Sequence, residues 1–383
     1  MSNQLFDVSV YAARLSKAAR LAADRGLGGL VFGTGADLQY LIGSTVSSHE
    51  RLTALVVPTV GRPTLVLPAV ERGDLPACAI GDLDADVVLW EDGEDAHEIV
   101  AKLLAGADTI GVGSSLTANH LLPIMELTGA QLVLATPALR ELFMRKDEAE
   151  ITQLREAGAA IDRVLERVPE WLVAGRTERD VAADIERQIL AEGHSAVDFI
   201  IVGSGENGAN PHHDFSDRVL RNGDIVVVDI GGTWGAGYHS DCTRVFAVGE
   251  LRDDVAEAWS ILRTAQEAAK AAVRPGVTAA HIDAVAREVI TQAGYGEQFI
   301  HRTGHGIGLS THEEPFIMAG NDLVLEPGMA FSIEPGIYVH GDFGLRLEDI
   351  VVVTSDGCKS MNNGSHELLC ANGSTSAADV EGK

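Results

Sequence analysis

The second half of the chain contains a segment that occurs twice. The stretch 175–193 resembles the stretch 276–294 at a constant displacement of 101 residues, with Thr177 matching Thr278. Each copy predicts a turn, a helix of about four turns and a glycine at the helix end. A repeat of this kind constrains the fold to two similar halves related by pseudo-symmetry.

The repeat continues into two apolar strands that each end on an acid. Gly-Asp-Ile-Val-Val-Val-Asp229-Ile-Gly resembles Gly-Met-Ala-Phe-Ser-Ile-Glu334-Pro-Gly at a displacement of 105. Asp241 and Glu348, displaced by 107, each lie near the start of a further apolar run. Each half therefore predicts two helices and an antiparallel strand pair with two acids, and packing of the halves would bring the four carboxylates together. A single strand-end acid is usually a capping residue, but buried acids need a counter-charge, so matched pairs favour a metal site.

A glycine-rich segment adds histidines to this candidate site. His301, His305 and His312 lie among glycines, which allow close approach of the backbone. One histidine with four carboxylates is an oxygen-rich ligand set, suited to Mn²⁺, Co²⁺, Fe²⁺ or Zn²⁺ in a two-metal site. Such a site generates hydroxide near neutral pH and polarises a carbonyl, which is the chemistry of amide hydrolysis.

Other motifs are weaker. For His212 the residues alone leave a site role and a surface role equally open, whereas His213 and His239 are expected to be surface or satisfied core residues. Residues 203–208 match G-x-G-x-x-G after an apparent strand, but Ala-Asn-Pro-His-His-Asp follows where a dinucleotide fold needs a helix. A dinucleotide site is therefore not predicted.

Composition limits the partners. The chain has 56 acidic and 29 basic residues, a formal net charge of −27, which argues against nucleic acid and against an anionic membrane surface. The longest apolar runs are of strand length, so no membrane span is expected. No secretory signal is visible, and four widely spaced cysteines indicate a reducing cytoplasm. The small polar tail from Asn372 is expected to be disordered.

The first part of the chain predicts a small α/β unit. A helix over 9–25 precedes short apolar runs and turns, and the unit ends near Thr136-Pro137. One charged helical segment is then expected over 139–168, with the domain boundary inside it. This gives an N-terminal α/β domain at 1–145 and a catalytic domain at 146–383.

Together these motifs resemble the metallopeptidases of the pita-bread (creatinase/aminopeptidase) fold. The resemblance lies in Asp229-Ile-Gly, Ser-Asp241-Cys-Thr-Arg, Thr-Gly-His305-Gly-Ile-Gly, Ser-Ile-Glu334-Pro-Gly and Arg-Leu-Glu348-Asp, and it is strongest to bacterial Xaa-Pro dipeptidases, or prolidases. It implies an α+β catalytic domain with an internal pseudo-twofold repeat, preceded by a smaller creatinase-like α/β domain.

The resemblance also implies roles for single residues. Asp229 would bind one metal, His305 and Glu334 the other, and Asp241 and Glu348 would bridge them. His212 and His312 would contact the substrate and stabilise the tetrahedral intermediate, with Glu334 relaying the proton. His301 would lie near the leaving residue, and Arg346, also on the substrate side, would support a bridging acid.

One spacing departs from the family. Asp229 and Asp241 are 12 residues apart, where 11 is expected in most relatives. We assign the extra residue to the hairpin loop Trp234–Gly237, because a slip of one residue in the strand pairing would turn Asp241 away from the site.

The resemblance implies hydrolysis of Xaa-Pro dipeptides by a metal-bridging hydroxide, with two divalent ions, Mn²⁺ first among them, in a cytoplasmic homodimer acting on small peptides. The alternative is an Xaa-Pro aminopeptidase that releases the first residue of longer peptides. A metal-free amidinohydrolase of the creatinase type and a non-catalytic binding module both predict lost ligands, and here all five ligands are present.

Overall fold

The structure is a computed structural model that describes residues 5–48 and 50–371. The tail expected to be disordered, 372–383, lies outside the described residues. The chain divides into two compact units, Met1–Phe143 and Met144–Lys383. In the described residues no helix has both the length and the hydrophobicity needed to cross a bilayer.

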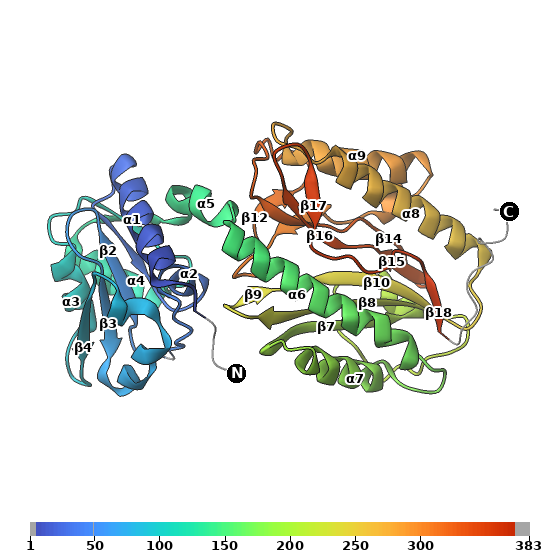
Figure 1. The fold of residues 1–383 in the computed structure, drawn as a ribbon, viewed down its shortest axis with the longest axis horizontal. Helices are drawn as coiled ribbons and strands as arrows, with labels where there is room; N and C mark the ends of the chain where they lie inside the picture. The colour runs from blue at the N-terminus through green and yellow to red at the C-terminus, as the bar shows by residue number, and fades with distance from the viewer. Residues whose placement is uncertain (1–4, 49, 372–383) are drawn as a thin grey trace. The chain divides into compact units, whose positions relative to one another are not determined.

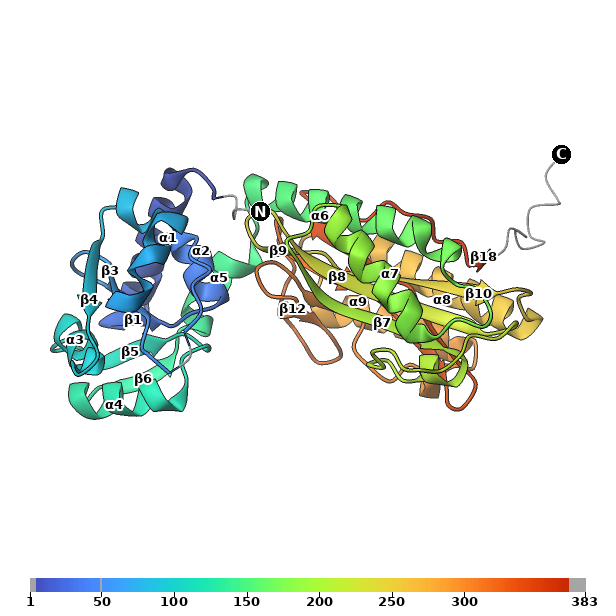
Figure 2. The ribbon, with the colours of Figure 1, turned by 90° about the horizontal axis from the view of Figure 1, so that it is seen from below.

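The first unit is a mixed six-stranded sheet in the order β4-β3-β2-β1-β5-β6 with helices on it (Figures 1 and 2). β1 pairs antiparallel with β2 and parallel with β5. The elements are α1 (Val8–Asp24), β1 (Gly29–Phe32), α2 (Ala36–Ile42), β2 (Ala54–Pro58), β3 (Thr64–Pro68), the 3₁₀ segments η1 (Ala69–Ala77) and η2 (Ala79–Asp82), β4 (Asp86–Trp90), α3 (Ala96–Leu103), β5 (Thr109–Val112), α4 (Ala118–Thr128) and β6 (Gln131–Leu134).

The charged segment that joins the two units forms two helices, whereas the sequence predicts one helix over 139–168. α5 (Thr136–Met144) ends before Arg145, whose backbone forms a bridge with Met329, and α6 (Glu148–Arg167) begins after Asp147. The Asp147 side chain accepts hydrogen bonds from the backbone of the first turn of α6, and the Glu150 side chain accepts one from the backbone N–H of Asp147. This reciprocal pair is a capping box. The helix therefore restarts at a strong N-cap instead of continuing.

The second unit has two sheets and a separate hairpin. One sheet has the order β18-β10-β8-β7 with β9 paired to β8, the other has the order β12-β11-β13-β16-β17, and β14 pairs with β15. After α6 and η3 (Val168–Glu170) the elements are α7 (Glu178–Ala191), β7 (Ala196–Ser204), η4 (Gly205–Ala209), β8 (Ile225–Trp234), β9 (Tyr238–His239), β10 (Cys242–Val248), α8 (Asp253–Ala272), α9 (Ala279–Gln292), η5 (Gly296–Gln298), β11 (Gly304–Gly306), β12 (Glu313–Ile317), β13 (Ala330–Ile333), β14 (Gly336–Val339), β15 (Phe343–Arg346), β16 (Asp349–Val353), β17 (Cys358–Ser360) and β18 (Leu369–Ala371).

The predicted repeat is present in the structure. Thr177 caps α7 and Thr278 caps α9, each by accepting a hydrogen bond from the backbone three residues on. Each half of the unit is a pair of long helices followed by antiparallel strands, α6 and α7 with β7, β8 and β10, then α8 and α9 with β11, β13 and β16.

Two hydrophobic clusters show how the strands pack. Val226 and Val228 of β8 belong to the cluster formed with α6 and α7, whereas Ile225 and Val227 belong to the cluster formed with α8 and α9. Successive side chains of a strand point to opposite faces. The two faces of β8 are thus both buried, and Asp229, in phase with Val227, lies on the face directed towards the second half.

Candidate metal centre

The first pair of acids lies on one face of the β8–β10 hairpin. Asp229 is opposite Thr243, and the pairing from Trp234↔Tyr238 to the far end of the ladder keeps one continuous register. Asp241 is in register with Gly231, two residues beyond Asp229, so both acids point to the same side. The extra residue of this spacing is accommodated in the three-residue turn 235–237, and Asp241 is not turned away.

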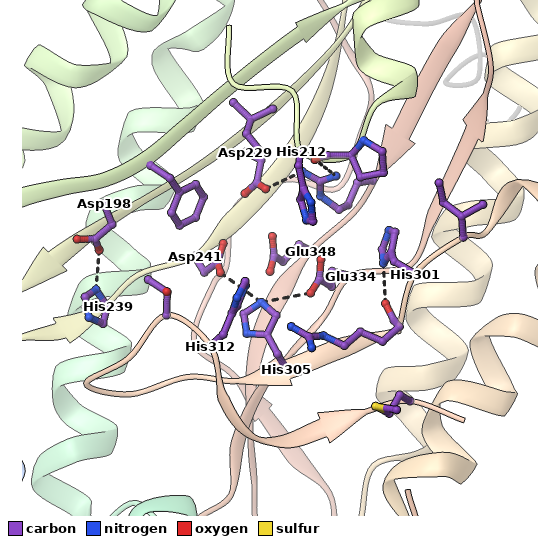
Figure 3. Close-up of a pocket in the computed structure, with 18 of the residues that line it drawn as sticks. Asp198, His212, Asp229, His239, Asp241, His301, His305, His312, Glu334 and Glu348 are labelled. Atoms are coloured by element: carbon purple, nitrogen blue, oxygen red, sulfur yellow. Dashed lines mark hydrogen bonds and ion pairs between the residues drawn. The ribbon is translucent and has the colours of Figure 1, made fainter. Parts of the chain in front are cut away.

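The second pair lies on one face of the hairpin that runs from β13 through β16. Ile333 is opposite Asp349 and Gly336 is opposite Arg346 in the same continuous register. Glu334 and Glu348, which lie between these pairs, therefore face each other on one side. The two hairpins, on different halves of the repeat, supply the four carboxylates of one cluster (Figure 3).

His305 completes the cluster from the short strand β11. Its Nδ1 lies 3.1 Å from the carbonyl oxygen of Gly306, and its Nε2 lies 3.6 Å from Asp241 Oδ2 and 3.3 Å from Glu334 Oε1. Burial lowers the pKa of the His305 ring to about 4, so the ring is neutral at pH 7. With its proton on Nδ1, the ring directs the lone pair of Nε2 at the carboxylates.

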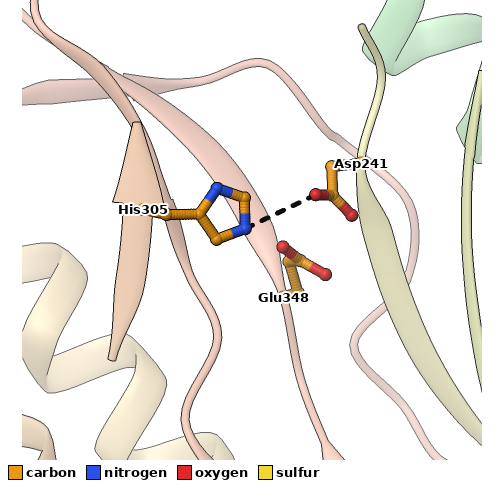
Figure 4. A group of neighbouring side chains, drawn as sticks. All are labelled: Asp241, His305 and Glu348. Atoms are coloured by element: carbon orange, nitrogen blue, oxygen red, sulfur yellow. Dashed lines mark ion pairs between the residues drawn. The ribbon is translucent and has the colours of Figure 1, made fainter. Parts of the chain in front are cut away.

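The cluster has the geometry of a cation site. Asp241, His305 and Glu348 are buried, and each offers one ligand atom within 4.8 Å of the others (Figure 4). Two buried carboxylate oxygens that face this region, Asp229 Oδ1 and Glu348 Oε1, have no hydrogen-bond partner among the described residues. A lone pair opposite carboxylates, together with unpaired buried oxygens, is a donor set with more negative charge than the one guanidinium of Arg346 balances, and it fits divalent ions.

The electrostatics of the acids agree with this fit. Burial, and then the charge of Glu348, raises the pKa of Asp241 well above its ordinary value. Burial, and then the charge of Glu334, raises the pKa of Glu348 well above its ordinary value, and burial also raises that of Glu334. Each shift reports that these carboxylates are unfavourable as anions unless a cation lies among them.

The cluster opens into a cavity of about 1210 Å³. His212, His301 and His312 line it, together with all four acids of the cluster and His305. The His312 ring packs edge-on against His305 with centroids 4.0 Å apart, and desolvation followed by the charge of His305 lowers its pKa to about 4. The structure therefore brings the three sequence-predicted histidines to the same cavity as the metal cluster.

Arg346 lines the cavity and contacts the cluster. Its Nη2 donates to Asp229 Oδ2 at 2.6 Å and its Nε donates to Thr243 Oγ1 at 3.0 Å, while Thr243 donates to Glu348 Oε2 at 2.7 Å. Arg346 thus contacts Asp229 directly and reaches Glu348 through Thr243, so its link to the expected bridging acid is indirect. Arg346 also donates to the hydroxyl of Tyr338 at 2.8 Å.

Tyr338 also links this group to the third cavity histidine. Its hydroxyl lies 2.9 Å from Nε2 of His301, and burial lowers the pKa of that ring. Sequence reasoning did not single out Thr243 or Tyr338. Strand alternation could have identified both residues. Thr243 lies an even number of residues from Asp241, and Tyr338 lies an even number from Glu334, each on the same hairpin as that predicted ligand.

Two other histidines each lie within hydrogen-bonding distance of an acid. His213 Nε2 lies 2.8 Å from Glu178 Oε2, and His239 Nδ1 lies 2.6 Å from Asp198 Oδ2. The glycine motif at 203–208 leads into the 3₁₀ segment η4 and a loop, and β7 pairs antiparallel with β8, so the parallel strand–helix geometry of a dinucleotide site is absent from this stretch.

Comparison with known proteins agrees with the geometry. Residues 152–355 match metallopeptidase family M24, and residues 14–145 match the creatinase/prolidase N-terminal domain. A probable dipeptidase PepE of Mycobacterium bovis is 58% identical over 96% of this chain and 99% of its own length. An Xaa-Pro dipeptidase of Lactobacillus delbrueckii subsp. lactis is 39% identical over 86% of this chain and 91% of its own length.

The solved structure of dipeptidase PepE from Mycobacterium ulcerans superposes with a TM-score of 0.92 at 57% identity, covering 96% of this chain and 99% of that one. The predicted fold class is confirmed: an α+β pita-bread catalytic domain with an internal repeat follows a smaller α/β domain. The protein is an enzyme, and the chain belongs to metallopeptidase family M24.

Proposed function

We propose that this enzyme hydrolyses Xaa-Pro dipeptides with two divalent metal ions. The observation that carries the proposal is the buried donor set, in which the neutral His305 ring lies beside the carboxylates of Asp241 and Glu348, and Asp229 and Glu348, each with an unpaired oxygen, line the same cavity. The substrate class follows from the relative named an Xaa-Pro dipeptidase, which shares 39% of its residues with this chain.

The ligand roles follow the two hairpins. Asp229 would hold one ion and His305 and Glu334 the other, and Asp241 and Glu348 would be shared by both. Ions bound there would supply a hydroxide nucleophile from water and polarise the scissile carbonyl. The matches at 14–145 and 152–355 support a division into domains at 1–145 and 146–383.

The remaining roles belong to side chains of the cavity. His212 and His312 line it and are placed to donate hydrogen bonds to the oxygen of a tetrahedral intermediate. Glu334, whose pKa is raised by burial, takes the proton from the attacking water and returns it to the leaving nitrogen. His301 contacts the leaving residue, and Arg346 fixes Asp229 on the substrate side.

The proposal also covers the identity of the metal, the cellular compartment and the assembly. Oxygen-rich ligation favours Mn²⁺, and Co²⁺, Zn²⁺ or Fe²⁺ fit the same donors. All four cysteines are free, as in a protein of the reducing cytoplasm. We further propose a homodimer that acts on small peptides, without nucleic acid or membrane partners.

The test compares three peptides with the Mn²⁺-loaded enzyme. The proposal predicts turnover of Ala-Pro, little turnover of Ala-Ala and none of Ala-Pro-Ala. Preferential cleavage of Ala-Pro-Ala would replace the dipeptidase by an Xaa-Pro aminopeptidase. Equal cleavage of Ala-Ala and Ala-Pro would refute the proline preference.

A further inference from the structure

A buried carboxylate outside the metal cluster organises the loop that carries His212. Glu178 is the first residue of α7 and is fully buried. It lies behind the segment 204–216, which leaves the end of β7 and passes along the cavity before the chain enters β8. It is neither a predicted ligand nor a residue that lines the cavity.

Every group around this carboxylate is a donor. Its Oε1 accepts from the backbone N–H of Ser204 at 2.8 Å and from the Ser204 hydroxyl at 2.6 Å. Its Oε2 accepts from the backbone N–H of Ser216 at 2.8 Å and from the Ser216 hydroxyl at 2.7 Å. Since Ser204 and Ser216 are the two ends of the segment, one side chain closes the loop at its base.

Two further contacts hold the interior of the loop. Asn207 donates from Nδ2 to Oε1 of Glu178 at 3.0 Å, and Nε2 of His213 lies 2.8 Å from Oε2. His213 is the chain neighbour of His212. Because the His213 ring is held by Glu178, the backbone at this point is fixed, and so is the direction of the His212 side chain, which leaves the other side of the backbone. In Figure 3 the His212 ring points into the cavity above the carboxylate cluster.

The far side of the same loop is joined to the metal cluster. The carbonyl oxygen of Pro211 accepts a hydrogen bond from Nη1 of Arg346 at 3.3 Å, and Arg346 binds Asp229 at 2.6 Å. His212 thus lies on a stretch of backbone anchored to Glu178 on one side and to the ligand-supporting arginine on the other.

The charge state of Glu178 suits this function. Burial on its own raises the pKa of the carboxyl, but hydrogen bonds from Ser204, His213 and Ser216 lower it to about 2. The group is an anion at neutral pH, and an anionic carboxylate only accepts hydrogen bonds, which matches the all-donor surroundings. Its place at the first turn of α7 adds the favourable field of the helix N-terminus.

From these contacts we infer that Glu178 is a positioning residue, which acts on peptide hydrolysis by fixing the loop 204–216 so that His212 faces the substrate. The inference rests on the proposed function in needing a peptide that the enzyme cleaves and a His212 ring that contacts it. Any peptide turned over by the wild-type enzyme serves, so a wrong proline preference leaves the test intact.

The test is a double-mutant cycle of Glu178→Gln and His212→Ala in the Mn²⁺-loaded enzyme. Glu178→Gln keeps the shape but turns an amide NH₂ towards donors, and it should lower kcat/KM about tenfold to a hundredfold, the size typical of partners that orient a site residue. The bound metal content should be unchanged. In the His212→Ala background the same substitution should lower kcat/KM less than twofold, because the loop then has no ring to place.

Two results would overturn the inference. One is a Glu178→Gln enzyme within twofold of wild type. The other is an equal proportional loss with and without His212, since a purely structural defect acts independently of that ring. If Glu178→Gln does not fold, Ser216→Ala serves instead, because it removes one hydroxyl donor from the network. Its loss of kcat/KM should be smaller than that expected for Glu178→Gln, and it must likewise vanish in the His212→Ala background.

Discussion

Arg346 binds one oxygen of Asp229 at 2.6 Å and leaves the other oxygen, Oδ1, without a hydrogen-bond partner among the described residues. A guanidinium that occupies one side of a carboxylate fixes the direction of the second lone-pair region. Asp229 and Arg346 both line the cavity that contains the other acids and His305. The ion pair therefore fixes the orientation of the Asp229 carboxylate and adds one positive charge beside the acids.

The first prediction concerns this orientation. Arg346→Lys keeps one positive charge but loses the fork that contacts Asp229, Thr243 and Tyr338 together. We expect a loss of about tenfold to a hundredfold in Mn²⁺ affinity, measured by calorimetric titration. Arg14→Lys is the matched control, because Arg14 is equally buried but belongs to the first unit and donates to the carbonyl of Tyr40. Unchanged Mn²⁺ binding by Arg346→Lys would contradict the assigned role.

The second prediction concerns Glu348. Glu348→Gln keeps the acceptor for Thr243 but removes the negative charge, so hydrolysis should be lost with the bridging ligand. Metal should also cease to raise the melting temperature, because binding to the native state is the source of that increase. A fully active variant would refute the ligand assignment.

The third prediction concerns pH, in metal-free protein. A carboxyl whose pKa is raised by folding stabilises the native state fully below its unfolded pKa, and this stability is lost as pH rises through the native pKa. The pKa of Glu348 is raised from an ordinary value of 4.5. The metal-free wild type and Glu348→Gln should therefore be close in stability near pH 4, and the variant should become the more stable one as pH rises above that value.

Thermal melts of both proteins between pH 4 and pH 8 check this sign. The comparison of the two chains removes the contribution of carboxyls that do not interact with Glu348, such as Glu178, whose pKa is lowered and whose stabilisation disappears only towards acid. A stability gap that narrows with rising pH would show that Glu348 is not destabilised as an anion.

The fourth prediction concerns His312. Its ring lies against His305 with centroids 4.0 Å apart and lines the cavity without belonging to the buried ligand group. His312→Ala should lower kcat about a hundredfold to a thousandfold, the usual effect of losing one donor to an oxyanion, at unchanged metal content. His340→Ala, at an exposed turn between β14 and β15, is the control and should retain activity. Metal loss from His312→Ala would assign it to the ligands instead.

Much of the site was predictable because the governing rules are local. Strand alternation places Asp229 and Asp241 on one face, and Glu334 and Glu348 on another, once the hairpins are recognised. The displacement of 101 residues between the two helical segments predicted the paired halves.

The unpredicted parts depend on contacts between distant segments. Glu178 follows a helix cap and reads as an ordinary first-turn acid, because its partners at Ser204 and Ser216 are brought to it only by tertiary packing. The charged helix restarts at Asp147 because of a local capping box with Glu150, whereas the bridge from Arg145 to Met329, nearly two hundred residues away, depends on tertiary packing. No periodicity in the sequence encodes either contact.

The central claim is that the clustered acids and His305 hold the ions needed for hydrolysis. It is tested most directly by measuring Ala-Pro hydrolysis in protein stripped by a chelator to verified metal depletion, and again after Mn²⁺ is restored. The account predicts that activity disappears with the metal and returns with it in the wild type, but not in Glu348→Gln. Undiminished hydrolysis by the verified metal-free enzyme would contradict it.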